Sequence, residues 1–302
     1  MAEQPSILSI RNVSRAFRNV QALNGVSFEV GEGQVHVLLG HNGAGKTTLI
    51  RIILGLIRAT SGSVLVSGLD TWKTRGGRQT REKLGVLFEQ DALYEDISAM
   101  ENLELFSRIH RLHHQTWRNR AEDMLTSVGL YDRRHERVGK WSAGMKRKLS
   151  IIRALQHQPQ LVVLDEPTAG LDVQSRGKIR DAIDRCRSQN TAFLIASQDL
   201  AEVQRIASHV TLLRRGKILY SGTIAGFYAQ ARLKRFHGST EALKSFLGSL
   251  PAGTELVREE QDVLGDAALI RIPPSLQANE IRPMGLAETP VPLEDIYLEL
   301  DK

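Results

Sequence analysis

The chain has 302 residues, of which 41% are hydrophobic and 25% charged, values ordinary for one large or two modest globular domains. The net charge of +6 is small for this length and does not indicate a particular kind of binding partner. The single cysteine, Cys186, excludes an intramolecular disulfide framework and is consistent with a reducing compartment. The sequence has no run of 18 apolar residues and no leader-like start, so we expect neither a membrane span nor a signal peptide.

The first predicted elements lead into a glycine-rich loop. Alternating apolar and polar side chains predict strands near residues 8–11 and 26–30, and the apolar run 35–39 predicts a buried strand. Residues 40–47 then read G-x-x-x-x-G-K-T, followed by a segment with the apolar residues of a packed helix. In this strand–loop–helix context the backbone N–H groups of the loop can surround a phosphate at a helix N-terminus.

This loop therefore predicts nucleotide binding. Lys46 is placed for the β- and γ-phosphates, and Thr47 for Mg²⁺. The residues expected to bind the nucleotide here are Gly40, Asn42, Gly43, Ala44, Gly45, Lys46, Thr47 and Thr48.

Further along the chain, helical and strand patterns alternate. Residues 60–68 predict a turn, a short strand and another turn, and the apolar spacing of 101–130 is helical, with Trp117 and Met124 on a buried face. Continuous apolar runs at 161–164, 193–196 and 210–213 are typical of strands covered on both faces. The alternation predicts a largely parallel α/β core.

Two carboxylates follow the apolar run at 161–164. At the end of this predicted strand, Asp165 can hold Mg²⁺ through water, while Glu166 can turn toward the γ-phosphate. A carboxylate in that position can orient or deprotonate the attacking water. We therefore expect Asp165 to be a metal residue and Glu166 to be catalytic.

The pattern changes after residue 223. Residues 240–250 and 293–300 look helical and 267–272 look like a strand, with no further phosphate chemistry. We expect an ATP-binding domain over 1–231 and a small α+β accessory domain over 232–302.

A third motif carries a resemblance to a known family. Residues 141–148 read W-S-A-G-M-K-R-K and open a predicted helix, with Ser142 as its N-cap. This segment resembles the signature of ABC ATPases, L-S-G-G-Q followed by basic residues: Ser142 and Gly144 match, whereas Trp141, Ala143 and Met145 depart. The resemblance covers about residues 7–223 and implies a P-loop NTPase of ABC ATPase type, with a helical signature subdomain at about 90–157, using ATP and Mg²⁺.

The resemblance also implies roles for single residues. In the family, the loop at Ser142 and Gly144 reaches the γ-phosphate of a head-to-tail partner, and residues 169–172, ending in Asp172, resemble the loop that links the two sites. Phe17 stands where the family has an aromatic residue that stacks on adenine, the alternative being a core phenylalanine.

Two further departures from the family pattern concern the residues expected to act on the phosphates and the metal. The family's Q-loop glutamine falls on Glu89, although a shift of one residue would restore Gln90; a Glu89 carboxylate can still ligate Mg²⁺ but cannot donate a hydrogen bond. The family's switch histidine is replaced by Gln198, whose amide can donate to a γ-phosphate oxygen and accept from water. We expect Gln198 to be catalytic and Glu89 to be a metal residue.

Segments 101–109 and 292–298 resemble the ATPase subunits of drug- and sodium-export-type ABC transporters. We therefore expect an ATP-hydrolysing subunit that powers an exporter from the cytoplasmic face of the membrane. Its expected partners are a separately encoded transmembrane permease and a second ATPase subunit, most simply a homodimer, and no nucleic acid. The alternatives are an ATP-gated regulatory ABC protein with weak hydrolysis and a soluble ABC ATPase outside transport.

Overall fold

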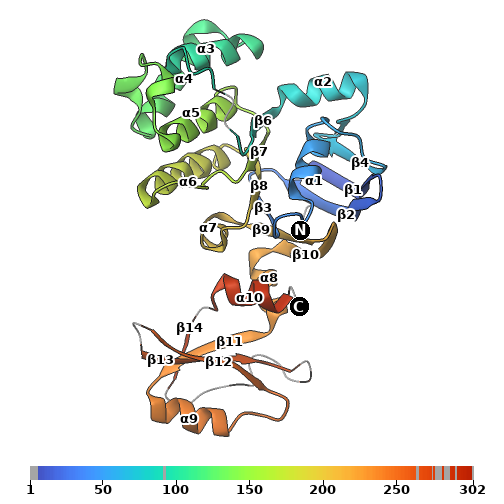
Figure 1. Cartoon of the computed structure of the whole chain (residues 1–302), viewed down its shortest axis with the longest axis vertical. Helices are drawn as coiled ribbons and strands as arrows, with labels where there is room; N and C mark the ends of the chain where they lie inside the picture. The colour runs from blue at the N-terminus through green and yellow to red at the C-terminus, as the bar shows by residue number, and fades with distance from the viewer. Residues whose placement is uncertain are drawn as a thin grey trace. The chain divides into compact units, whose positions relative to one another are not determined.

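A computed structural model describes residues 6–90, 93–262, 265–273, 275, 281, 286–289 and 291–300. The expectation of no leader concerns residues 1–5, which lie outside this described part. The chain divides into two compact units, Met1–Ser221 and Gly222–Lys302, and each is described by itself (Figure 1).

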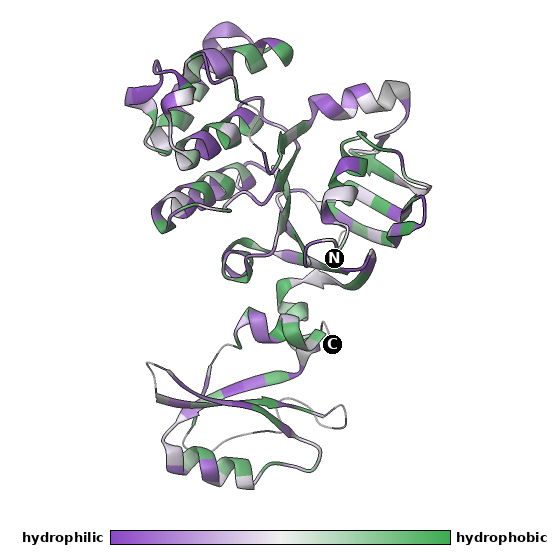
Figure 2. Ribbon diagram, in the orientation of Figure 1, coloured by the Kyte–Doolittle hydropathy of each residue, from purple (hydrophilic) through white to green (hydrophobic). Residues whose placement is uncertain are grey.

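A six-stranded sheet forms the centre of the first unit. Its strand order is β10-β9-β3-β8-β7-β6, and the five strands from β9 to β6 pair in parallel. The strands span Val35–Leu39 (β3), Leu84–Leu87 (β6), Leu161–Asp165 (β7), Ala192–Ser197 (β8), His209–Arg214 (β9) and Lys217–Thr223 (β10). Strands β3, β7 and β8 are buried along their whole length, because both of their faces are covered, and they are among the most hydrophobic segments in Figure 2.

An antiparallel sheet of order β2-β1-β4-β5 packs in the same unit. Its strands span Ser6–Phe17 (β1), Val20–Gly31 (β2), Ser61–Val66 (β4) and Leu69–Asp70 (β5). Leu8 and Ile10 of β1 share one apolar core with Leu49 and Ile53 of α1 and with Leu194 of the central sheet. This core fixes the glycine-rich loop between the two sheets.

The helices of this unit are α1 (Lys46–Ile53), α2 (Thr74–Glu82), α3 (Ala99–Ile109), α4 (His114–Ser127), α5 (Ala143–Leu155), α6 (Val173–Arg187) and α7 (Leu200–Ile206), with short 3-10 turns at Tyr131–Arg133 and Val138–Lys140. In Figure 1, α3 to α6 lie on one side of the central strands, and α1 with the antiparallel sheet lies on the other.

Helices α3, α4 and α5 form a helical subdomain with its own core. Trp117 is 3% exposed and packs with Leu103, Leu125 and Trp141, and Met124 packs partly buried against the same cluster. The segment predicted as helical over 101–130 forms two helices, because the chain turns between them at Arg111, whose φ is 54°.

The second unit is an α+β arrangement. A sheet of order β12-β13-β11-β14 pairs antiparallel throughout, and Phe236, Phe246 and Ile270 lie in its core. The elements are α8 (Ile224–Ala231), β11 (Leu233–Gly238), α9 (Thr240–Gly248), β12 (Glu255–Asp262), β13 (Gly265–Arg271), β14 (Ala287–Thr289) and α10 (Leu293–Leu300).

The boundary between the units lies about ten residues before the expected one at 231/232. Helix α8 belongs to the second unit because it contacts α10, near the other end of that unit's sequence. The two helices lie some 70 residues apart in the sequence, so their contact cannot be predicted from local patterns. The change of sequence pattern after residue 223 lies closer to the observed boundary than residue 231 does.

Candidate nucleotide site

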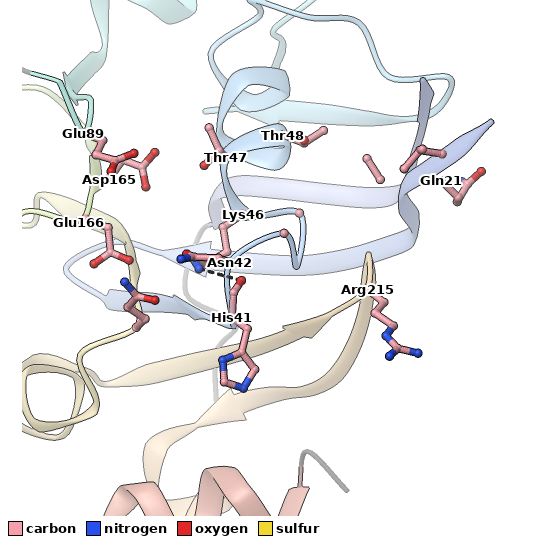
Figure 3. Close-up of a pocket in the computed structure, with 15 residues that line it drawn as sticks. Gln21, His41, Asn42, Lys46, Thr47, Thr48, Glu89, Asp165, Glu166 and Arg215 are labelled. Carbon is pink, nitrogen blue, oxygen red and sulfur yellow. Dashed lines mark hydrogen bonds between the residues drawn. The ribbon is translucent and has the colours of Figure 1, made fainter. Parts of the chain in front are cut away.

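A pocket of about 500 Å³ lies between the glycine-rich loop and the carboxyl ends of the central strands. It is lined by Val20, Gln21, Ala22, His41, Asn42, Gly43, Gly45, Lys46, Thr47, Thr48, Glu89, Asp165, Glu166, Gln198 and Arg215. Figure 3 shows Glu89, Asp165 and Glu166 on one side of the loop and Gln21 and Arg215 on the other. The pocket therefore has one strongly acidic end and one end that offers neutral and basic groups.

The loop joins β3 to α1, and its shape depends on glycine. Gly45 has a φ of 112°, and a Cβ there would lie 2.7 Å from the backbone oxygen of Ala22. A Cβ on Gly40 would lie 2.4 Å from the backbone oxygen of Leu213. Side chains at these two positions would push the loop away from the neighbouring strands, and helix α1 would no longer begin at Lys46 beneath the pocket.

Lys46 is buried, with its ammonium held by the loop itself. Its Nζ donates to the backbone oxygen of Gly40 at 2.5 Å and to that of His41 at 3.2 Å. Burial lowers the pKa of Lys46, and the nearby Glu166 and Asp165 carboxylates oppose this shift. The cation thus lies where phosphate oxygens can take over from carbonyl oxygens as its acceptors.

Three carboxylates converge on the acidic end. Burial raises the pKa of Asp165, and the neighbouring Glu89 carboxylate adds to that shift while Lys46 opposes it. Burial likewise raises the pKa of Glu166, with Lys46 opposing and Asp165 adding to the shift. Glu166 also has a φ of 47°, a strained conformation for a residue other than glycine and one that recurs at functional sites.

The donor set of this end fits Mg²⁺ bound together with a nucleotide. Asp165 and Glu89 offer carboxylate oxygens and Thr47 offers a hydroxyl, the hard donors that this ion prefers. Within the described residues, no three His, Cys, Asp or Glu side chains are arranged to hold a metal by themselves. Phosphate oxygens would have to complete the coordination, as is usual for Mg²⁺ in nucleotide sites.

Gln198 follows strand β8 and also lines the pocket. Its backbone N–H donates to the Glu166 carboxylate and lowers that group's pKa slightly against the effect of burial. Glu89, rather than its neighbour Gln90, is among the described residues that line the pocket. Both positions that depart from the family pattern thus lie at the acidic end.

Ser142, Gly144 and Asp172 do not line this pocket among the described residues. Ser142 caps α5 by accepting a hydrogen bond from the backbone N–H of Met145 at 3.3 Å, and Asp172 caps α6 by accepting one from that of Ser175 at 2.8 Å. The amino-terminal ends of these two helices therefore lie outside the nucleotide pocket of their own chain, as far as the described residues show.

Phe17 is 42% exposed, which rules out the alternative of a core phenylalanine. It lies at the end of β1, opposite Val20 of β2, and the Arg15 guanidinium lies over one face of its ring, 4.4 Å from the centroid. Phe17 itself is not among the described lining residues, whereas Val20 is.

Five lining residues were not predicted from the sequence. Val20, Gln21 and Ala22 follow Phe17 across the β1–β2 turn, so the position of the aromatic residue could have indicated them. His41 lies inside the loop motif at a variable position. Arg215 lies in the turn between β9 and β10, far along the chain, and only the packing of that turn against the loop brings it to the pocket.

The raised pKa of Glu166 predicts a pH dependence. A general base must be ionised in the free enzyme, so kcat/KM for ATP should fall with decreasing pH at a higher pH than an ordinary glutamate, with a pKa of about 4.3, would give. Burial is the main cause of the shift, but Glu89 contributes, so Glu89→Gln should move this acid limb to lower pH. Glu95→Gln, which changes a carboxylate paired with Lys146 elsewhere, is the matched control. Acid limbs that coincide for the parent and Glu89→Gln would contradict the assignment.

Fold and site together define a P-loop nucleotide-binding protein. A family model described as "ABC transporter" matches residues 23–169. The ABC transporter ATP-binding protein NatA of Bacillus subtilis (strain 168) is 34% identical over 231 residues, which are 75% of this chain and 93% of the relative. The bacitracin transport ATP-binding protein BcrA of Bacillus licheniformis is 34% identical over 71% of this chain and 69% of its own length. A solved structure described as the ATP-binding subunit of an ABC transporter superposes with a TM-score of 0.70 at 26% identity, over 74% of this chain and 93% of that one.

The chain belongs to the ABC transporter family, as one of its ATP-binding subunits. ATP hydrolysis is the general activity of this family, and the prediction of an α/β P-loop ATPase is confirmed.

Proposed function

We propose that this chain is the ATP-hydrolysing subunit of an ABC exporter and works as a homodimer with a separately encoded membrane permease. The observation that carries the proposal is the division of the pocket, with Lys46 facing an acidic end that holds Glu166 while Ser142 lies outside. Such a site can bind the triphosphate by itself but needs a second chain to enclose it.

Each predicted residue has a role in this proposal. Lys46 and the loop N–H groups bind the phosphates, while Asp165, Glu89 and Thr47 would hold Mg²⁺, which neutralises charge on the β- and γ-phosphates. The oxygen of a water molecule attacks the γ-phosphorus while Glu166 accepts a proton from that water. The bond between the γ-phosphorus and the β–γ bridging oxygen breaks, and ADP leaves. The Gln198 amide holds the water or the γ-phosphate in line.

Phe17 is proposed to stack on the adenine. Arg15 lies over one face of its ring, and Phe17 is still 42% exposed, so part of its surface remains open to a base. The end of the pocket away from the carboxylates begins at Val20, directly across the turn from Phe17. A base stacked on Phe17 would therefore lie next to that end.

The second ATPase subunit is proposed to be another copy, bound head to tail. Ser142, Gly144 and Asp172 would then face the nucleotide of the partner, where the N-terminus of α5 can meet the γ-phosphate.

Ser142→Arg should test this arrangement in trans. The change blocks the partner's phosphate contact, so turnover should fall by about 100-fold or more, as when an oriented donor is lost, while ATP binding to the monomer stays intact. Mixed with Lys46→Ala chains, Ser142→Arg chains should recover at most one working site per dimer, measured as ATPase rate against mixing ratio. Ser239→Arg, at the N-cap of α9 and with the same 3.3 Å capping bond, is the control. If Ser142→Arg chains by themselves hydrolyse ATP at the parental rate, Ser142 is only a helix cap and does not act on the nucleotide of the partner.

The described residues contain no helix long and apolar enough to cross a membrane, so attachment to the cytoplasmic face of a membrane is proposed to depend on the permease. An apolar groove of about 420 Å³ on the first unit is lined by exposed Leu56, Phe88 and Ile109, with Arg81 and Arg153 also at the groove. It suits an apolar segment of the permease that carries an acidic side chain. The name of BcrA, which includes bacitracin transport, supports transport as the process.

Two steps test the function: establishing whether a gene beside this one encodes a multispanning membrane protein, and co-expressing the chain with that protein. The chain should sediment with membranes, and its ATPase rate should rise, only when that protein is present. Ile109→Asp should lose membrane association and keep its rate in solution, because Ile109 lies in the groove and not in the nucleotide pocket. Sedimentation that does not depend on the membrane protein would contradict the proposal.

Glu89 and Gln198 favour a second candidate, an ATP-gated regulatory protein with weak hydrolysis, because both lie at the acidic end in place of the family's residues. In that case the membrane protein would bind the ATP-loaded dimer without raising its rate. A soluble ABC ATPase outside transport would show no membrane association in the same experiment. The second unit is proposed to act in dimer stability or partner choice rather than in ATP binding.

A further inference from the structure

Arg147 makes a set of contacts that the proposed mechanism does not use. It lies on α5, five residues after Ser142, and is 6% exposed. Within the described part of the chain, its guanidinium donates to five backbone oxygens: those of Phe88 (2.7 Å) and Glu89 (3.2 Å) from Nη1, of Asp165 (2.7 Å) and Glu166 (2.6 Å) from Nη2, and of Pro167 (3.2 Å) from Nε.

These five oxygens belong to two separate segments of the chain. One segment follows β6 and carries Glu89, and the other is the end of β7 and carries Asp165 and Glu166. Each segment therefore delivers carboxylates to the acidic end of the pocket, and a single buried side chain is bonded to both.

The contacts depend on the shape of the guanidinium. Its planar, forked donors reach two segments at once, whereas a lysine ammonium is a point charge on a flexible stem that can satisfy only one group of oxygens well. The charge also acts on the site. Burial is the main cause of the raised pKa of Asp165, and the Arg147 charge is one of the groups that oppose it.

We propose that Arg147 is a positioning residue that holds the Glu89 segment and the Asp165–Glu166 segment at a fixed separation, so that the metal-binding and water-orienting carboxylates face the same phosphate. The inference rests on the proposed function of the pocket. Because Arg147 belongs to the helix that Ser142 caps, the same contacts tie the acidic end to the surface proposed to meet the second chain.

Arg147→Lys tests the role, with Arg180→Lys as the matched control. Arg180 lies on α6, donates from Nη1 to both carboxylate oxygens of Glu202 at 2.7 and 3.0 Å, and is not among the described residues that line the pocket or the apolar groove. For Arg147→Lys we expect kcat to fall by about 10- to 100-fold, in the range lost with misplaced catalytic groups, with the ATP Kd in EDTA nearly unchanged. For Arg180→Lys we expect both to stay near the parent values.

A second readout needs no turnover. The ratio of the ATP Kd in EDTA to that in Mg²⁺ measures how well Glu89 and Asp165 act together, and it should fall toward one in Arg147→Lys and in Arg147→Gln. Unchanged kcat and unchanged ratio in a folded Arg147→Lys would overturn the proposal. So would global unfolding of both Arg147 variants while Arg180→Lys stays folded, since Arg147 would then determine the fold and not the site. Failure of the unmutated chain to bind Mg-ATP would instead overturn the proposed function.

Discussion

Glu166→Gln is expected to bind ATP normally and to hydrolyse it about 10²- to 10⁴-fold more slowly than the parent, the usual cost of losing a general base. The amide has nearly the same size as the carboxylate and can still accept the hydrogen bond from the backbone N–H of Gln198, so the strained backbone at this position should persist. ATP should then hold the two chains together, because the proposed dimer closes on ATP and opens only after the slow hydrolysis step. Single-turnover kinetics and the mass of the ATP-bound species by light scattering measure both effects.

Glu32→Gln, which removes an exposed carboxylate in the turn after β2, is the control and should behave like the parent. A Glu166→Gln chain that turns over at the parental rate would show that another group activates the water. A chain that remains monomeric at saturating ATP would contradict the proposed closed dimer.

Lys46→Ala is expected to weaken ATP binding by about 10- to 100-fold. Hydrogen bonds to charged groups contribute about 1.5–3 kcal/mol each, and every 1.4 kcal/mol changes the affinity about tenfold. The ammonium is buried between the loop carbonyls and the Asp165 and Glu166 carboxylates, so no solvated cation replaces it when it is removed. Equilibrium titration with a fluorescent ATP analogue gives the Kd directly.

The loss of Lys46 also leaves two loop carbonyls without this donor, so the melting temperature must be measured beside the affinity. Lys217→Ala, at an exposed position on β10, is the control for removal of a positive charge. If Lys46→Ala is folded and binds ATP as the parent does, the loop does not hold the triphosphate in the way proposed.

The central fold was predictable because its signals are local. Strands β7 and β8 consist largely of continuous apolar runs and β3 is apolar apart from His36, and each strand is buried on both faces in the structure. The glycine-rich loop and the Asp165–Glu166 pair follow two of these strands directly, and the carboxyl ends of parallel neighbours lie at one edge of the sheet. The acidic end of the pocket follows from that geometry.

Other features were missed because they depend on distant parts of the chain. The boundary before α8 depends on its contact with α10, and the separation of α3 from α4 depends on a left-handed residue, Arg111, that the apolar spacing does not reveal. The end of the pocket away from the carboxylates contains Arg215. The turn that carries Arg215 is held against the loop by the hydrogen bond from the Gly216 N–H to the Ala44 oxygen.

The sequence by itself determined the glycine-rich loop, the Asp165–Glu166 pair at a strand end and the class of ATPase, because a motif of contiguous residues constrains its own backbone and therefore its own chemistry. Only the tertiary structure decided that Glu89 rather than Gln90 lines the pocket, that Ser142 lies outside its own pocket, and that Phe17 is exposed beside Arg15. It also revealed that Arg147 contacts the ends of two strands, although in the sequence Arg147 is only one basic residue among several. A hydrogen bond between groups tens of residues apart is set by how the strands and helices pack, and that packing has no local signature in the chain.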